Sequence, residues 1–237
     1  EVNITSTQNT SYNNSESSKK GSSVRKSSTD IDYKITNIAS NLETNGDVNI
    51  ASGRDTNIVA SNLSGNNGNI IVGKYTDLNA SSPTFGQEII NNDAKLTIKS
   101  GEDLHYNYHE QTKIKTDSTA VAVGVVVAVA VTVASGGAGA AVAGAVLSGA
   151  ATGEQGKKGK TTTTETTEIN QVASNLNFTS DLNTQSSGDT VIQASNLSAN
   201  NATILTGKFR DQNTGVENIV NLDSKLIDIA TAVEEAA

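Results

Sequence analysis

Residues 39–79 read ASNLETNGDVNIASGRDTNIVASNLSGNNGNIIVGKYTDLN, and residues 173–213 read ASNLNFTSDLNTQSSGDTVIQASNLSANNATILTGKFRDQN. Aligned without a gap at an offset of 134, the two stretches are identical at 22 of 41 positions. Inside each stretch the tetrad Ala-Ser-Asn-Leu recurs after 21 residues, at 39 and 60 and again at 173 and 194. A period near 20 residues is typical of solenoid proteins, so this unit predicts a repeat architecture.

The 21-residue unit contains strand and turn signals and few helix signals. Short alternating runs such as Asp47–Ile50, Thr56–Val59 and Asn69–Val72 are separated by Gly, Asn and Asp, which are the residues of tight turns. Runs of three to five residues are too short for helices. The unit therefore predicts an all-β fold, a three-faced parallel β-helix with three short strands in each rung.

The alignment also predicts which side chains face the interior. Apolar residues keep their character between the two stretches, in the pairs Ile58 and Ile192, Leu63 and Leu197, Ile70 and Ile204, and Val48 and Leu182. Asn62 and Asn196 share a polar position, and stacked rungs about 4.8 Å apart let asparagines form ladders of amide hydrogen bonds. Neighbouring rungs must supply the stability, because one rung cannot bury its own apolar face.

Composition supports a thin apolar core and excludes some functions. The chain has 237 residues, of which 35% are hydrophobic and 3% aromatic, with a formal net charge of −8. An acidic chain lacks the basic face of a nucleic-acid-binding protein. It has no cysteine and therefore no disulfide framework. Because it has no methionine and opens on the strand-like residues 1–5 without a signal peptide, we expect an internal fragment of a longer protein.

The order of segments predicts three parts. Residues 1–117 form a first β-helix module with a polar, mobile excursion at 8–30, residues 118–160 form an apolar insertion with a basic, flexible linker, and residues 161–237 form a second module. Residues 94–98 are a predicted strand with a counterpart at 224–228. The segment 223–237 also has helical spacing, so a short helix competes with that strand.

The insertion has no charged residue from Ser118 to Gly153. Valine occupies every odd position from 121 to 133, which predicts a β-strand. Ser135–Gly139 can reverse the chain, and 140–151 would return as the second arm of a hairpin. Three interpretations stay open: a hairpin packed on the solenoid, a membrane-active segment, and a transmembrane helix. The candidate membrane-interacting residues are Val121, Val123, Val125, Val127, Val129, Val131, Val133, Val142, Val146 and Leu147.

Sequence signals for an enzyme or a metal site are weak. His105 and His109 are the only histidines, and a strand would hold them about 13 Å apart along one face, so we expect exposed loop histidines rather than metal ligands. No Gly-x-Ser-x-Gly elbow or Walker lysine is present. Aspartates at the repeat turns, Asp47, Asp55, Asp181 and Asp189, are expected to cap turns. We predict no catalytic residue, cofactor or metal.

Residues 46–58, Gly-Asp-Val-Asn-Ile-Ala-Ser-Gly-Arg-Asp-Thr-Asn-Ile, resemble the haemagglutinin repeat of filamentous-haemagglutinin-like exoproteins of two-partner secretion systems. The polar segment 15–21 and the Ala/Gly/Val-rich tract followed by lysines also resemble that family. The second copy departs from the pattern, with Ser180 and Ser187 in place of Gly46 and Gly53.

The resemblance implies a right-handed β-helix that is secreted to the bacterial cell surface through an outer-membrane transporter. It implies a non-enzymatic stalk for adhesion to a target-cell receptor, or for presentation of an effector. The alternative is a membrane-active module of contact-dependent inhibition proteins, which helps a C-terminal toxin outside this sequence to cross a target-cell outer membrane.

Overall fold

A computed structural model describes residues 1–116, 124–135, 142–148, 157–211 and 213–229. These residues form strands and no helix, so the predicted all-β class is confirmed. Contacts between strands divide the chain into two units, each described by itself. The first unit takes its described residues from 1–7, 37–101 and 172–232, and the second from 8–36 and 102–171. The boundaries expected at 117/118 and 160/161 both fall inside the second unit.

The first unit contains three sheets in which all neighbouring strands are parallel. The first sheet has the order β1 (Val2–Thr5), β6 (Thr56–Val59), β11 (Leu96–Lys99), β18 (Thr190–Gln193) and β23 (Leu226–Ile229). The second has β4 (Asn41–Glu43), β7 (Asn62–Gly65), β16 (Asn175–Phe178) and β19 (Asn196–Ser198). The third has β5 (Val48–Ser52), β8 (Gly68–Val72), β17 (Asp181–Ser186) and β20 (Asn201–Thr206).

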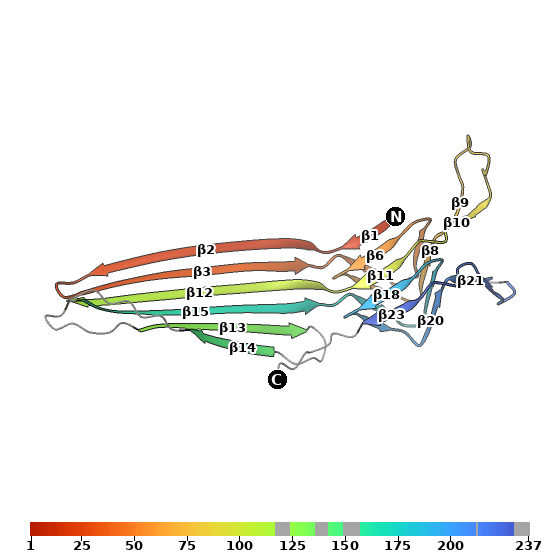
Figure 1. Cartoon of the computed structure of the whole chain (residues 1–237). Coiled ribbons are helices and arrows are strands. Elements are labelled where there is room, and N and C mark those ends of the chain that lie inside the picture. The colour runs from red at the N-terminus through yellow and green to blue at the C-terminus, as the bar shows by residue number, and fades with distance from the viewer. Residues whose placement is uncertain (117–123, 136–141, 149–156, 212, 230–237) are drawn as a thin grey trace. The chain divides into compact units, whose positions relative to one another are not determined.

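Successive strands of this unit visit the three sheets in a constant order. From β4 to β23 the chain passes through the second, third and first sheets four times, with longer segments inserted between β8 and β11, β11 and β16, and β20 and β23. Within each sheet, a strand lies beside the equivalent strands of the passages before and after it (Figure 1). The 21-residue period therefore corresponds to one passage through all three sheets.

Rows of like apolar side chains run across these sheets and form the core. In the first sheet, Ile4, Ile58, Ile98 and Ile192 are consecutive partners. In the second sheet, Leu42, Leu63, Leu176 and Leu197 form the corresponding row. Ile58, Leu63, Ile98 and Leu176 have no exposed surface. The inward positions predicted from the alignment are confirmed for Val48, Ile58, Leu63, Ile70 and Leu182, which are all buried.

Two antiparallel hairpins extend from equivalent positions of the first unit, after Gly73 and Gly207. One pairs β9 (Lys74–Thr76) with β10 (Glu88–Ile90), and the other pairs β21 (Lys208–Arg210) with β22 (Glu217–Ile219). Gly73 has a φ of +87° and Gly207 a φ of +69°, a conformation that glycine adopts at little cost. Both hairpins are visible in Figure 1.

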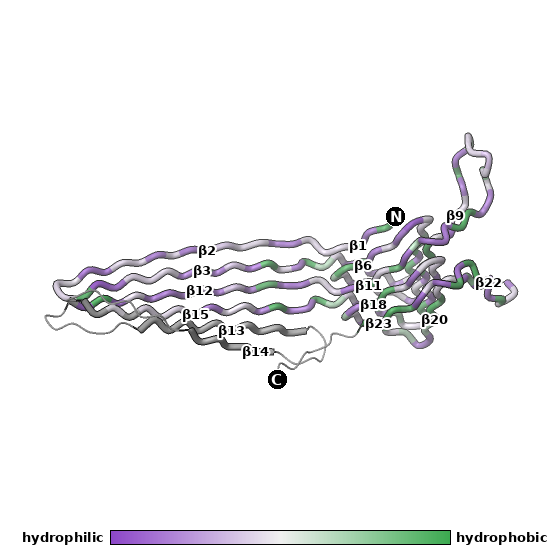
Figure 2. The backbone as a smooth tube through the Cα atoms, viewed as in Figure 1, coloured by the Kyte–Doolittle hydropathy of each residue, from purple (hydrophilic) through white to green (hydrophobic). Residues whose placement is uncertain are grey.

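The second unit is a six-stranded sheet (Figure 1). Its order is β14 (Val142–Ser148), β13 (Gly124–Ser135), β15 (Lys157–Val172), β12 (Gly101–Thr116), β3 (Val24–Ile38) and β2 (Thr7–Lys20). β12 and β3 pair antiparallel, as do β13 and β14, whereas β13 and β15 are parallel. Figure 2 shows that β2 is almost entirely hydrophilic, and each of its residues is exposed.

One expectation from the sequence is corrected, and one open alternative is decided. Most of the polar residues 8–30, expected to form a mobile excursion, lie in the long strands β2 and β3, because the neighbouring strands satisfy their backbone groups without help from apolar side chains. The Thr-rich segment 161–167 lies in β15. Residues 226–229 form the strand β23 and not a helix, since β18 pairs with them in parallel. The remainder of the predicted helix, 230–237, lies outside the described residues.

The predicted apolar hairpin is confirmed where the structure describes it. β13 and β14 pair antiparallel, with Val133 opposite Val142 and Val129 opposite Val146. Val121, Val123 and the expected reversal at 136–139 lie outside the described residues.

Candidate functional site

The asparagine of each Ala-Ser-Asn-Leu tetrad belongs to one continuous ladder. The ladder consists of three side-chain hydrogen bonds: from Asn62 to Asn41 at 2.7 Å, from Asn175 to Asn62 at 2.8 Å and from Asn196 to Asn175 at 2.8 Å. The predicted ladder is therefore confirmed. Its bonded pairs differ from the aligned pairs, because Asn62 bonds to Asn41 and Asn175 and not to Asn196. These asparagines support neighbouring strands, and their amides are largely engaged with one another.

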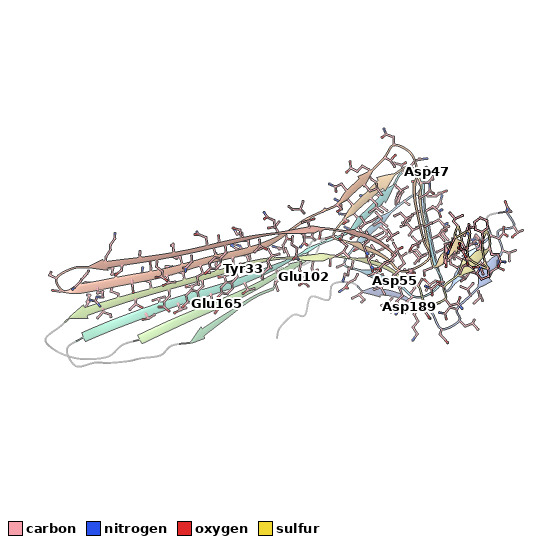
Figure 3. The ribbon with its side chains drawn as sticks, turned by 90° about the horizontal axis from the view of Figure 1, so that it is seen from above. Tyr33, Asp47, Asp55, Glu102, Glu165 and Asp189 are labelled. Carbon is pink, nitrogen blue, oxygen red and sulfur yellow. The ribbon has the colours of Figure 1, made fainter. Side chains whose placement is uncertain are left out.

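The four repeat aspartates accept hydrogen bonds from residues of the next passage of the chain through the three sheets. Asp55 accepts the Lys95 N–H at 2.9 Å, and Asp189 accepts the Lys225 N–H at the same distance. Asp47 accepts a bond from the Asn67 amide at 2.8 Å, and Asp181 accepts one from Asn201 at 2.9 Å. Figure 3 shows Asp55 and Asp189 at one corner of the first unit and Asp47 at another. The expectation that these aspartates cap their own turns is corrected: the bonds join successive passages of the chain, 20 to 40 residues apart in sequence.

The two histidines lie on β12, and the expectation of exposed loop histidines is wrong. His105 Nε2 lies 2.8 Å from Asp32 Oδ1 and 3.0 Å from Asn107, and its Nδ1 faces Glu168 at 3.5 Å. His109 Nδ1 contacts Asp30 on β3. The side chain of His105 is 27% exposed. Both ring nitrogens of His105 are engaged, so this residue joins β12 to β3 and β15.

The opposite face of the same sheet carries tyrosines paired with carboxylates. Burial, and then the hydrogen bond and charge of Glu165, raise the pKa of Tyr106. A hydrogen bond of 2.7 Å to Glu110 is the main cause that raises the pKa of Tyr108. Figure 3 shows Tyr33 and Glu165 on this long sheet. Both phenols therefore stay protonated at neutral pH, and they act as hydrogen-bond donors rather than as acids.

An open pocket of about 490 Å³ lies at the base of the β9–β10 hairpin. Its lining residues are Glu1, Gly53, Arg54, Tyr75, Ile89 and Asn91. The Tyr75 ring rests on Gly53, where a Cβ atom would lie 2.3 Å from the ring. The Asn91 amide donates to the Gly53 carbonyl at 3.2 Å and so ties the hairpin to the turn. Tyr75 and Arg54 therefore line the same pocket.

Sequence reasoning missed this pocket. Tyr75 and Arg54 are 21 residues apart and carry no motif, and the fold brings them together by returning β9 over the end of β5. The signal that was present is the difference between the two repeats: Arg54 corresponds to Gly188, and Tyr75 corresponds to Phe209.

The described part of the chain contains no group of three or more His, Cys, Asp or Glu side chains arranged to hold a metal ion. This part of the chain also contains no helix with the length and apolar character that crossing a membrane requires.

Comparisons with protein-family models, with curated proteins and with solved structures found no match to this chain.

Proposed function

We propose that this chain is a non-enzymatic segment of a large exoprotein on the bacterial surface, a stalk built as a right-handed parallel β-helix. The observation that supports this best is the repeated passage of the chain through three parallel sheets, each aligned with the 21-residue period. A coil of this kind grows by adding rungs, and each rung is stabilised by its neighbours. That property suits a stalk that carries an adhesive surface or an effector away from the cell.

The resemblance of residues 46–58 to the haemagglutinin repeat supplies the biological setting of this proposal. In that setting an outer-membrane two-partner secretion transporter exports the chain, and a receptor on a target cell is the partner of the exposed protein. A C-terminal toxin outside this sequence is the effector that such a stalk would present. The lack of cysteine suits export, since no premature disulfide can form.

A membrane-active delivery module is the second candidate, and the β13–β14 pair favours it. The segment from Ser118 to Gly153 is uncharged, and Val129 and Val146 are register partners in the two paired strands. The pairing of β13 with β14 satisfies part of their backbone groups, and the groups on the outer edges would need further strands in a lipid environment. In this function the segment enters the outer membrane of the target cell during toxin delivery.

Liposome flotation separates the two candidates. The full chain and a variant lacking residues 120–153 are mixed with vesicles, and circular dichroism is recorded for both. Flotation of the full chain alone, with an unchanged β-rich spectrum, supports the delivery module. If neither protein floats, the stalk is supported. A helical spectrum of the deletion variant would contradict the β-helix.

A further inference from the structure

The triplet Asn-x-Ser/Thr, in which x is not proline, is the acceptor sequence of N-linked glycosylation and is used in surface loops. The chain contains eight such triplets, and their asparagines are Asn3, Asn9, Asn13, Asn62, Asn79, Asn177, Asn196 and Asn201. Every one of these asparagines except Asn79 belongs to a strand. Asn79 lies in the loop 77–87 between β9 and β10. The fold therefore leaves one triplet in the setting where an acceptor functions.

The triplets in strands are unsuited to carry a sugar. In three of them the amide nitrogen Nδ2, the atom that a sugar would be attached to, already donates to a side chain of another passage through the sheets. The bonded pairs are Asn62 with Asn41, Asn196 with Asn175, and Asn201 with Asp181. The other four triplets begin inside strands that pair with a neighbour, which keeps their backbone extended.

The triplet Asn79-Ala80-Ser81 differs in both respects. All three residues are exposed, and Asn79 Oδ1 accepts the Ser81 N–H at 3.1 Å, so the side chain closes a turn over the triplet. The Asn79 Nδ2 atom and the Ser81 hydroxyl form no hydrogen bond with any residue that the structure describes. The two groups that define an acceptor triplet are therefore accessible together.

The loop keeps its shape without help from the Asn79 amide nitrogen. Asp77 accepts hydrogen bonds from the Asn79 N–H at 2.9 Å and from the Thr84 hydroxyl at 2.6 Å. The Asn79 carbonyl accepts the Ser82 N–H at 2.9 Å. Figure 1 shows the hairpin extending away from the three parallel sheets of its unit. A sugar on Asn79 Nδ2 would break none of these bonds.

The hairpin of the second repeat provides a comparison within the same chain. Asn213 aligns with Asn79, and its N–H donates to Asp211 at 2.7 Å, the same bond that Asn79 makes at the start of its own loop. Gly215 aligns with Ser81, so the second loop lacks the hydroxyl group of the triplet. A hairpin loop of this type therefore forms without the serine, and the serine is available for recognition.

We propose that Asn79 is an acceptor site for N-linked glycosylation. The second reactant is a sugar activated by a diphosphate group at its anomeric carbon. The Asn79 Nδ2 atom forms a bond to that carbon while the bond from the carbon to the diphosphate oxygen breaks. The diphosphate leaves with the bonding electrons, and Nδ2 loses one proton. The proposal goes beyond the stalk function, because it holds whether the chain is a stalk or a delivery module.

Glycosylation of the folded full chain, followed by peptide mapping with mass spectrometry, tests the proposal. One reaction contains a soluble asparagine N-glycosyltransferase and UDP-glucose, and a second contains an oligosaccharyltransferase and a lipid-linked oligosaccharide, so the two sources of activated sugar are distinguished. Synthetic peptides that contain the Asn62 and Asn79 triplets are treated in the same way. We expect both peptides to be modified, whereas in the folded chain the glycan should be confined to Asn79.

Variants of Ser81 keep the asparagine and change only its recognition. Ser81→Ala should abolish the modification of Asn79, and Ser81→Thr should retain it because the hydroxyl group remains. Both variants should fold as the parent chain does, since the Ser81 hydroxyl has no partner in the described structure, and Asn213 should stay unmodified throughout. Absence of glycan on Asn79 in both reactions, equal modification of Asn62 in the folded chain, or unchanged modification of Ser81→Ala would each overturn the proposal. None of these outcomes alters the flotation result, so the two proposals fail separately.

Discussion

Each residue of the tetrad Ala-Ser-Asn-Leu has its own task in the turn between the first and second sheets. Ala60 and Ala194 have positive φ angles of 46° and 45°, which lets the chain change direction. Ser61 donates to the Val59 carbonyl at 2.8 Å, and Ser195 donates to Gln193 in the same way. The asparagine joins the ladder and the leucine enters the core. These alanine and serine roles belong to the tetrads at 60 and 194, whereas in the tetrads at 39 and 173 Ser40 donates to the Thr5 carbonyl and Ser174 to the Lys99 carbonyl.

Removing one asparagine from the middle of the ladder should destabilise the first unit. Asn62 both donates to Asn41 and accepts from Asn175, so Asn62→Ala removes two hydrogen bonds and is expected to lower the free energy of unfolding by about 1–2 kcal/mol. Chemical denaturation measures the change. Asn49→Ala is the matched control, because Asn49 is exposed and its side chain has no hydrogen bond to any residue that the structure describes, and its effect should stay within about 0.5 kcal/mol. Equal effects would contradict the ladder's role.

The loop of the β9–β10 hairpin should depend on pH through Asp77. Hydrogen bonds from Ser82, Thr84 and the Asn79 N–H hold the pKa of Asp77 below its usual value of 3.8. The stability that this carboxylate contributes is present above the unfolded pKa and is lost as pH falls through the folded pKa. An NMR titration of the Asn79 amide should therefore show a midpoint below 3.8. Asp77→Asn should abolish this transition, and a midpoint at or above 3.8 would contradict the prediction.

At the scale of the elements, each hairpin of the first unit starts from a glycine that no other residue can replace at equal cost. A Cβ atom on Gly73 would lie 1.9 Å from the Ser187 hydroxyl oxygen and 2.8 Å from the Asn91 carbonyl. The equivalent Gly207 approaches Ser224 as closely, at 1.8 Å. Each hairpin therefore begins where the backbone lies in close contact with a serine of another passage through the sheets.

Gly73→Ala should therefore cost more than a change at another glycine of the same hairpin. Gly86 has a similar φ of +78°, but open space surrounds its Cβ position. Gly86→Ala should lower the free energy of unfolding by about 1 kcal/mol through the backbone alone, and Gly73→Ala by about 3 kcal/mol or more because a clash is added. Thermal and urea unfolding measure both. Similar values for the two variants would show that the turn relaxes and that the close approach is unimportant.

For the whole molecule, the order of strands across a sheet predicts which residues can be cross-linked. Ser64 on β7 lies opposite Asn177 on β16, and Ser198 lies one strand further, on β19. Adjacent strands are about 4.8 Å apart and alternate ones about 10 Å apart, and a disulfide requires Cα atoms within about 7 Å. The chain has no cysteine of its own, so introduced pairs are unambiguous.

The variant Ser64→Cys/Asn177→Cys should form a disulfide under mild oxidation, while Ser64→Cys/Ser198→Cys should remain reduced. Non-reducing electrophoresis and mass spectrometry distinguish the two products. Efficient cross-linking of the second pair, or none of the first, would contradict the strand order β4, β7, β16, β19. This experiment tests the β-helix independently of flotation.

The sequence alone predicted the all-β class, the strands of the repeat, the buried positions such as Leu63 and Ile70, the asparagine ladder and the apolar hairpin. These are consequences of local periodicity and of a repeat that places equivalent residues side by side. The polar strands β2 and β15 were missed because their side chains carry no apolar alternation, and their strand state comes from backbone pairing with partners distant in sequence. The surroundings of His105 were also missed, because its partners Asp32 and Glu168 lie on two other strands that are distant in sequence.

Only the tertiary structure shows which residues from distant parts of the sequence lie side by side. Asn62 has Asn175 as its next partner, 113 residues away, and the alignment at an offset of 134 could not show this. The pocket exists because β9 returns over β5 and seats Tyr75 on Gly53 beside Arg54. Periodicity specifies which face of a strand is apolar, whereas the approach of separate segments depends on the packing of the whole unit, which no short stretch of sequence contains.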